Sequence, residues 1–129
     1  MKVRKVILVE DDPDDRELFA AFLSGRSDIE IVTSVTNGRE LIEFLSDVDD
    51  KQLPDLIVID QNMPLMTGKQ TLKYLKSSDR YRNIPAVIYS THADNNLVLE
   101  CSALGAKMVS SKPLNEEGYN RMMDNFLKL

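Results

Sequence analysis

The sequence predicts an open, doubly wound parallel α/β sheet, in which five strands lie between two layers of helices. Five short apolar runs alternate with five stretches of helical periodicity, which is the order typical of a parallel sheet covered on both faces. Most of the runs are continuous, as in strands that are buried on both sides. The 129 residues suit one domain, whereas an eight-stranded α/β barrel needs about 250.

The five predicted strands differ in how clearly the sequence marks them. The first run is β-branched, and the third and fourth are short and continuous. The second alternates, so its odd-numbered positions from Ile29 to Val35 should lie on one side of the sheet. The fifth is the weakest. The predicted ranges are 3–9, 29–35, 56–59, 86–89 and 107–110.

The helices are predicted from the residues that begin them. Small polar side chains that accept a hydrogen bond from the first turn are typical N-caps, and they occur at Asp12, Asn37, Thr67, Asp94 or Asn95, and Asn115. Pro13 then occupies the first position of the first helix. Glu40 and Gln70 follow their caps by three residues, the spacing of a capping box.

Apolar positions at helical spacing predict which face of each helix is buried. In the first helix they are Leu18, Ala21 and Phe22, and Gly25 is its predicted end. Gly105 should end the fourth helix. The clearest stripe is in the fifth helix, where the methionines are expected to fill the core: Tyr119, Met122, Met123, Phe126 and Leu127.

Composition excludes several classes of function. The net charge is −5 and the pI about 4.9, whereas nucleic-acid-binding domains are usually basic. No apolar run approaches the roughly 20 residues that span a bilayer, and the run after the basic start is too short for a signal peptide. We therefore expect a cytoplasmic protein that binds neither nucleic acid nor membrane. The single cysteine, Cys101, should pack in a helix, and the single histidine, His92, cannot build a zinc site alone.

Polar side chains follow four of the five predicted strands. Glu10 and Asp11 come after the first, Asp60 after the third, Ser90 after the fourth and Lys112 after the fifth. The carboxyl ends of the strands in an open parallel sheet share one edge, and ligands bind there. We therefore expect these five residues to meet at that edge.

The expected group of side chains suits phosphoryl chemistry on a metal ion. Three carboxylates packed together either take up protons or need a cation. Oxygen ligands without thiolates or a histidine cluster favour a hard cation, most simply Mg²⁺, which often shares its carboxylates with a phosphate. Lys112 adds a compact positive charge for a phosphoryl oxygen, and Ser90 adds a hydroxyl donor. Phosphoryl transfer needs this kind of positioning and charge neutralisation.

Asp60 is the predicted nucleophile, since an aspartate can form an aspartyl phosphate. It ends the most apolar strand, so we expect it to lie centrally and to face the acid pair. The loop over residues 61–64 then turns away from the sheet and can aim a backbone carbonyl at the metal. Pro64 lacks an N–H group and helps to fix that turn.

The motifs around these residues resemble those of response-regulator receiver domains, the CheY-like domains of two-component signalling. The matching stretches are ILVEDDP, DLIVIDQNMPLMTG, PAVIYST and SSKP. Each is weak alone, but in this order and spacing they are specific and cover essentially the whole chain. The resemblance implies a flavodoxin-like fold with strand order 2-1-3-4-5 and five helices. It also implies a single, stand-alone receiver domain over residues 1–129, with no output domain.

The resemblance assigns a role to each site residue. Asp60 would be the phosphoacceptor, Ser90 the hydroxyl that follows the phosphoryl group, and Lys112 its charge partner. Glu10 would contribute to the metal site through a water molecule, and the Lys112–Pro113 bond would be cis. The implied ligands of Mg²⁺ are Glu10, Asp11, Asp60 and the backbone carbonyl of Asn62.

The resemblance also implies partners. A histidine kinase or histidine phosphotransferase would supply the phosphoryl group, and a downstream protein partner would receive the signal. The expected partner surface comprises the fourth helix, the fifth strand and the fifth helix. From position alone, the candidate contact residues on it are Leu99, Val109 and Arg121.

Two residues depart from the usual receiver pattern. Glu10 stands where aspartate is more frequent, and its longer side chain should still serve. Val109 stands where many receivers carry an aromatic residue that moves inward on activation. Activation is therefore expected to reach the partner surface through backbone shifts around Ser90, Thr91 and the fourth helix.

Two further features are His92, which has two interpretations, and the charge runs, which have one. His92 lies two residues after Ser90, as Asn62 lies two residues after Asp60. In receivers these positions flank the phosphoryl group and influence its hydrolysis, although His92 also fits an exposed loop residue. The charge runs at residues 14–15 and 47–51 are expected to be solvated faces.

The leading hypothesis is a phosphoacceptor switch, which would catalyse its own phosphorylation and dephosphorylation but would not turn over an external substrate. Three other functions compete with it. A receiver-like binding module whose phosphorylation is unused is favoured only by Val109. A phosphohydrolase of the haloacid-dehalogenase type would need a second aspartate where Asn62 stands, and a cap domain. A dinucleotide-binding fold would need a glycine-rich loop after the first strand, but residues 10–14 are acidic and lack glycine.

Overall fold

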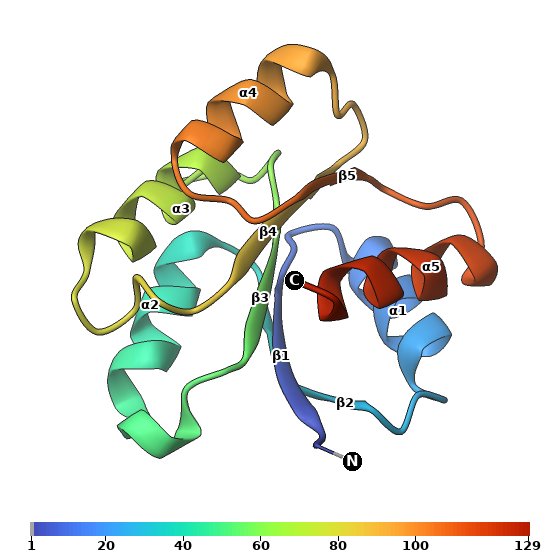
Figure 1. Ribbon diagram of the computed structural model, residues 1–129, viewed down its shortest axis with the longest axis horizontal. Helices are drawn as coiled ribbons and strands as arrows, with labels where there is room; N and C mark the ends of the chain where they lie inside the picture. Colours follow the sequence, from blue (N-terminus) through green and yellow to red (C-terminus); the bar gives the residue numbers. More distant parts are fainter. Residues whose placement is uncertain (1) are drawn as a thin grey trace.

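The computed structural model describes residues 2–129 and has three layers, with one five-stranded sheet between two layers of helices (Figure 1). The strand order is β2-β1-β3-β4-β5, and every neighbouring pair is parallel. This confirms the fold class and strand order predicted from the sequence. The strands are β1 (Arg4–Val9), β2 (Ile29–Val35), β3 (Leu56–Asp60), β4 (Ala86–Ser90) and β5 (Val109–Ser111).

The five helices divide between the two faces of the sheet (Figure 1). On one face lie α1 (Pro13–Leu23) and α5 (Glu116–Leu127), and on the other lie α2 (Gly38–Asp47), α3 (Gly68–Ser77) and α4 (Asn95–Ala103). A short 3₁₀ helix, Asp50–Gln52, precedes β3. Within residues 2–129, none of these helices is long and apolar enough to cross a membrane.

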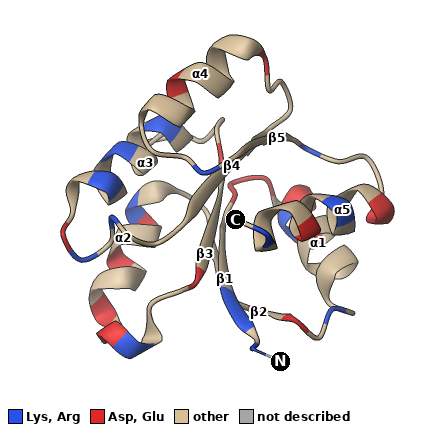
Figure 2. Cartoon of the chain, viewed as in Figure 1, with Lys and Arg blue, Asp and Glu red and all other residues tan. Residues whose placement is uncertain are grey.

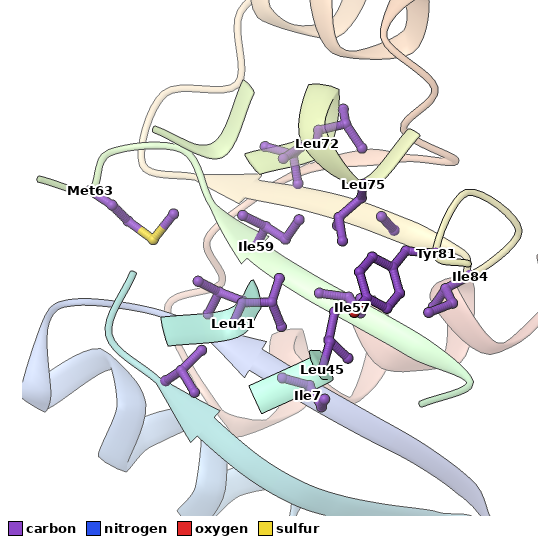
Figure 3. Close-up of a cluster of buried hydrophobic side chains, with 14 of the residues drawn as sticks. Ile7, Leu41, Leu45, Ile57, Ile59, Met63, Leu72, Leu75, Tyr81 and Ile84 are labelled. Carbon is purple, nitrogen blue, oxygen red and sulfur yellow. The ribbon is translucent and has the colours of Figure 1, made fainter. Parts of the chain in front are cut away.

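The central strand β3 is buried at all five positions because each face of the sheet covers a separate hydrophobic cluster. Ile57 and Ile59 point into the cluster formed with α2, α3 and α4 (Figure 3). Val58 points into the cluster formed with α1 and α5, which contains both predicted methionines of α5. Alternation of this kind explains why the run is continuously apolar. It also makes Asp60, the last residue of β3, the one polar residue in a fully buried strand.

The helix starts follow the predicted caps. Asp12, Asn37, Thr67, Asp94 and Asn115 each accept a hydrogen bond from a backbone N–H group of the first turn. The capping box at Thr67 is complete, with the Gln70 side chain accepting from the Thr67 N–H group. The box predicted at Asn37 is only half formed. Its glutamate, Glu40, instead accepts a hydrogen bond from the hydroxyl of Thr36.

The buried face of α1 differs in part from the prediction, although Phe22 packs against the core as expected. Phe19 and Leu23 are fully buried, whereas Leu18 is 40% exposed and Ala21 is exposed. Successive residues on a helix are rotated by about 100°, so one position separates a core residue from a surface residue. Phe19 and Leu23, which are four residues apart, pack together against β4 and α5.

The alternation predicted for β2 is also wrong, because the strand contains a bulge. Val6 of β1 pairs with Ile31, but the next residue, Ile7, pairs with Thr33, so Val32 is an extra residue. A one-residue shift exchanges the two faces of a strand. Ile31 therefore faces α1 and α5, while Val35 joins the cluster on the opposite side.

The last strand and the Lys112–Pro113 peptide bond also differ from the prediction. β5 begins at Val109, although Lys107 already donates a backbone hydrogen bond to Ala86 of β4. No cis peptide bond occurs within residues 2–129, so the Lys112–Pro113 bond, expected to be cis, is trans. Both isomers are accessible to a bond before proline, and trans is the more stable by about 0.5–1 kcal/mol.

Candidate functional site

The carboxyl ends of the strands bring the predicted site residues to one edge of the sheet. Glu10, Asp11 and Asp60 each place one carboxylate oxygen within 4.8 Å of the other two. Figure 2 shows the acidic loop that follows β1 and the basic position that follows β5 on the same side of the molecule. Three carboxylate oxygens this close offer a hard ligand set that suits a divalent cation.

Asp60 is a buried carboxyl group, with 2% of its surface exposed. Burial, followed by the hydrogen bond and negative charge of Glu10, raises the pKa of Asp60 to about 7. The positive charge of Lys112 opposes this rise. In the absence of another cation, Asp60 is therefore held between its protonated and ionised forms near neutral pH.

Lys112 is the cation of the site. Its Nζ atom lies 2.9 Å from Glu10 Oε1 and 3.3 Å from Asp60 Oδ1. It also lies 2.9 Å from Oδ2 of Asp15, in the first turn of α1. Burial lowers the pKa of Lys112, but the hydrogen bonds to Asp15 and Glu10, together with the negative charges of Glu10 and Asp60, raise it overall, so the ammonium stays charged.

Asp15 is thus a site residue that the sequence interpretation assigned to a solvated face. Its carboxylate is half-buried and fixes the third side of the Lys112 ammonium group. The cap at Asp12 and Pro13 show where α1 begins but not how the helix is rotated, so they did not identify Asp15.

Glu10 is fully buried and is held by several donors. The Tyr89 hydroxyl donates to Oε1 at 2.6 Å, and the Asp12 N–H group donates to Oε2 at 3.2 Å. The Arg16 guanidinium donates to the backbone carbonyls of Glu10 and Asp11, at 2.9 and 3.0 Å. Tyr89 was not predicted as a site residue, although a tyrosine in a fully buried strand needs a partner for its hydroxyl.

Ser90 and Asn62 lie where the sequence placed them, beside the acidic cluster. Ser90 is buried, and its Oγ atom accepts a hydrogen bond from the His92 N–H group at 3.3 Å. The Asn62 N–H group donates to Asp60 Oδ1 at 3.3 Å. Asn62, Ser90 and His92 line a common cavity of about 340 Å³ next to the carboxylates, together with Lys69 of α3.

The three candidates on the expected partner surface differ in exposure. Leu99 of α4 is 69% exposed, and Arg121 of α5 is also exposed. Val109 of β5 is half-buried and packs against the cluster on the α2, α3 and α4 side. It therefore lies beneath this surface rather than on it.

The loop after Asp60 depends on the glycine at position 68. A Cβ atom there would lie 2.7 Å from the Asp60 carbonyl oxygen and 2.8 Å from the Gln61 Cα atom. Both contacts are to backbone, which cannot move aside without shifting Asp60. We expect Gly68→Ala to lower the free energy of unfolding by about 1–3 kcal/mol, measured by urea denaturation.

Gly25→Ala is the matched control for this substitution. A Cβ atom at Gly25 meets nothing within 4 Å. We therefore expect the free energy of unfolding to change by no more than about 0.5 kcal/mol. If both variants lost the same free energy of unfolding, the close contacts of a Cβ atom at position 68 would not be the cause of the loss.

A family model for the response regulator receiver domain matches residues 6–123. The chain belongs to this family. It is a receiver domain of the kind found in two-component response regulators. Receiver domains are signalling modules that interact with histidine kinases or phosphotransferases and bind a divalent metal ion, for which the three carboxylates of this receiver offer ligands.

Two curated relatives illustrate the range of proteins that carry a similar domain. A protein-glutamate methylesterase/protein-glutamine glutaminase from Clostridium acetobutylicum is 32% identical over 130 residues, which are 99% of this chain and 36% of that protein. The rice response regulator ORR5 is 31% identical over 123 residues, which are 95% of this chain and 88% of that protein. The chain therefore spans only about a third of the methylesterase.

Solved structures of receivers resemble the whole chain. The phosphorylated cyanobacterial phytochrome response regulator RcpA is 26% identical, with a TM-score of 0.82 and coverage of 97% of this chain and 91% of that one. The chemotaxis response regulator CheY4 of Vibrio cholerae is 25% identical, with a TM-score of 0.80 and coverage of 97% and 99%. The resemblance identified from the motifs is thus confirmed.

Proposed function

We propose that this receiver domain is a phosphoacceptor switch in which Asp60 accepts a phosphoryl group from a histidine kinase or histidine phosphotransferase. The modified domain would then act on a downstream protein partner, and the proposal includes a cytoplasmic location. The observation that carries the proposal is the placement of Asp60. It is buried at the carboxyl edge of the sheet, among two further carboxylates and the Lys112 ammonium group.

The ligand set fits Mg²⁺, which is part of the proposal. Its protein ligands would be Glu10, Asp11, Asp60 and the backbone carbonyl of Asn62. The fit rests on the closeness of the three carboxylates and on their all-oxygen chemistry. When bound, Mg²⁺ would neutralise negative charge on the carboxylates and on the oxygens of the phosphoryl group.

Asp60, Lys112 and Ser90 have different roles in the transfer. A carboxylate oxygen of Asp60 forms the bond to phosphorus while the phosphorus–nitrogen bond of the donor phosphohistidine breaks, and the imidazole leaves with the bonding electrons. Lys112, already 3.3 Å from Asp60 Oδ1, supplies positive charge to the phosphoryl oxygens. The Ser90 hydroxyl donates a hydrogen bond to one of them, which changes its present contact with the backbone of His92.

Signalling follows from that change at the end of β4. The segment after Ser90 leads directly into α4, so a new hydrogen bond at Ser90 favours a different position of this segment and helix. The exposed Leu99 and Arg121 are proposed contacts of the downstream partner. Val109 supplies no aromatic ring for the usual inward movement, so the backbone must carry the signal.

The main alternative is a receiver-like binding module whose phosphorylation is unused, and Val109 is the feature that favours it. Turnover of an external substrate is not part of the proposal, because Asn62 stands where a hydrolase of this chemistry would need its acid. The methylesterase relative matches over a segment of receiver size, so its activity does not transfer to this chain.

Intact-mass measurement tests the proposal. After incubation with Mg²⁺ and acetyl phosphate, the parent should gain one phosphoryl group. Asp60→Asn should gain none, because the nucleophilic oxygen is replaced by an amide, and EDTA should prevent the adduct in the parent. A folded parent that gains no mass would support the binding module instead.

A further inference from the structure

Tyr89 lies directly beside the acidic site without belonging to its predicted residues. Its side chain is fully buried, and it precedes Ser90 on β4. Its hydroxyl donates to Glu10 Oε1 at 2.6 Å, and the Lys112 Nζ atom lies 5.0 Å from the centre of its ring. One side chain thus contacts both a carboxylate and the cation of the site.

The position of the Tyr89 hydroxyl is fixed by the core beneath it. Its ring packs edge-on against Phe19 of α1, with centroids 6.2 Å apart and an angle of 67° between the planes. Phe19 in turn packs edge-on against Tyr119 of α5, again at 6.2 Å. A hydroxyl held by packed rings is preorganised and loses little freedom when it donates a hydrogen bond.

Glu10 has few other donors. Its Oε1 atom accepts from Tyr89 and contacts the Lys112 ammonium group, and its Oε2 atom accepts from a backbone N–H group. A fully buried carboxylate is strongly destabilised without such partners. In the proposed transfer, Lys112 turns to the phosphoryl oxygens, and the Tyr89 hydroxyl is then the remaining side-chain donor to Glu10.

We propose that Tyr89 is a positioning residue that holds Glu10 in the metal-binding cluster and allows Lys112 to leave Glu10 for the phosphoryl group. This inference rests on the proposed function. It also explains the glutamate at position 10, since an aspartate is one methylene shorter and would not reach the Tyr89 hydroxyl. Residues that orient metal ligands in this way typically change metal affinity when they are replaced.

Metal binding by Tyr89→Phe tests the inference, because the substitution removes one oxygen atom and keeps the ring. Binding of Mn²⁺ can be followed from the loss of the electron paramagnetic resonance signal of the free ion, which does not depend on phosphorylation. We expect the dissociation constant to rise about 10-fold relative to the parent. Far-ultraviolet circular dichroism and thermal unfolding establish that the variant is folded.

Two matched comparisons separate positioning from packing. Tyr119→Phe makes the same chemical change elsewhere in the aromatic cluster, and it should leave the dissociation constant within about 2-fold of the parent value. In a Glu10→Asp background the carboxylate at position 10 is one methylene shorter, so we expect the Tyr89 hydroxyl to lose its bond to it. Adding Tyr89→Phe there should likewise change the affinity by less than about 2-fold.

Each outcome decides the inference. If the parent binds Mn²⁺ and accepts a phosphoryl group while Tyr89→Phe binds equally well, this inference alone is overturned. An equal loss of affinity in the Glu10→Asp background would assign the effect to packing and overturn it too. A parent that neither binds Mn²⁺ nor gains a phosphoryl group would overturn the proposed function and, with it, the role of Tyr89.

Discussion

Replacing Asp60 with asparagine is expected to stabilise the metal-free protein by about 2–4 kcal/mol above pH 7. Burial and the neighbouring Glu10 raise the pKa of Asp60 to about 7 in the folded protein, against about 3.9 in an unfolded chain. The stability that this group contributes is therefore complete below about pH 4 and is lost as the pH rises through 7. The neutral amide of Asp60→Asn avoids that loss.

The measurement is urea denaturation in EDTA at several pH values. The advantage of Asp60→Asn should be near zero at about pH 4 and should grow to its full size above pH 7. Asp55→Asn is the matched control at the other end of the same segment, where the carboxylate accepts a hydrogen bond from the Lys5 N–H group. It should not stabilise the protein. A variant at Asp60 that is less stable than the parent at pH 8 would contradict the electrostatic account of the site.

Replacing Lys112 with methionine is expected to have the opposite effect, a loss of about 3 kcal/mol in metal-free protein near neutral pH. The substitution keeps the unbranched chain up to its fourth atom but removes the only ammonium group that contacts Glu10 and Asp60 among residues 2–129. Both carboxylates are buried, so the lost attraction is not replaced by water. Added Mg²⁺ should recover more stability in the variant than in the parent, because it supplies the missing positive charge.

Lys69→Met is the control for Lys112→Met. Lys69 pairs with Glu100 across α3 and α4, but the pair is largely exposed, and water and salt screen such pairs. Its loss should change the unfolding midpoint far less. If both lysines proved equally dispensable in EDTA, the charge balance inferred for the acidic cluster would be wrong.

The positions of the main site residues could be predicted because they follow from the order of the strands. Each continuous apolar run must end at the same edge of a parallel sheet, so the first polar residues after these runs are brought together. Asp60 at the end of β3 and Ser90 at the end of β4 illustrate this directly. Such an argument needs only the chain order and the hydrophobic pattern.

The contacts between side chains within the site could not be predicted from the sequence in the same way. Whether Asp15 faces water or Lys112 depends on the rotation of α1, and of the three apolar residues that indicated the buried face only Phe22 packs against the core. The Tyr89 hydroxyl belongs to β4 and bonds to Glu10, which follows β1. The strand β3 lies between these two strands in the sheet. The bulge at Val32 has no mark in the sequence, because isoleucine, valine and threonine suit either face of a strand.

The most direct test of the central claim is to locate the phosphoryl group on the chain. Borohydride reduces an aspartyl phosphate to homoserine, and trypsin then releases the peptide Gln52–Lys69, which contains Asp55 and Asp60. Fragmentation of this peptide in a mass spectrometer distinguishes the two positions. The account predicts homoserine at position 60 and unmodified aspartate at position 55. Homoserine at position 55, with Asp60 intact, would contradict it.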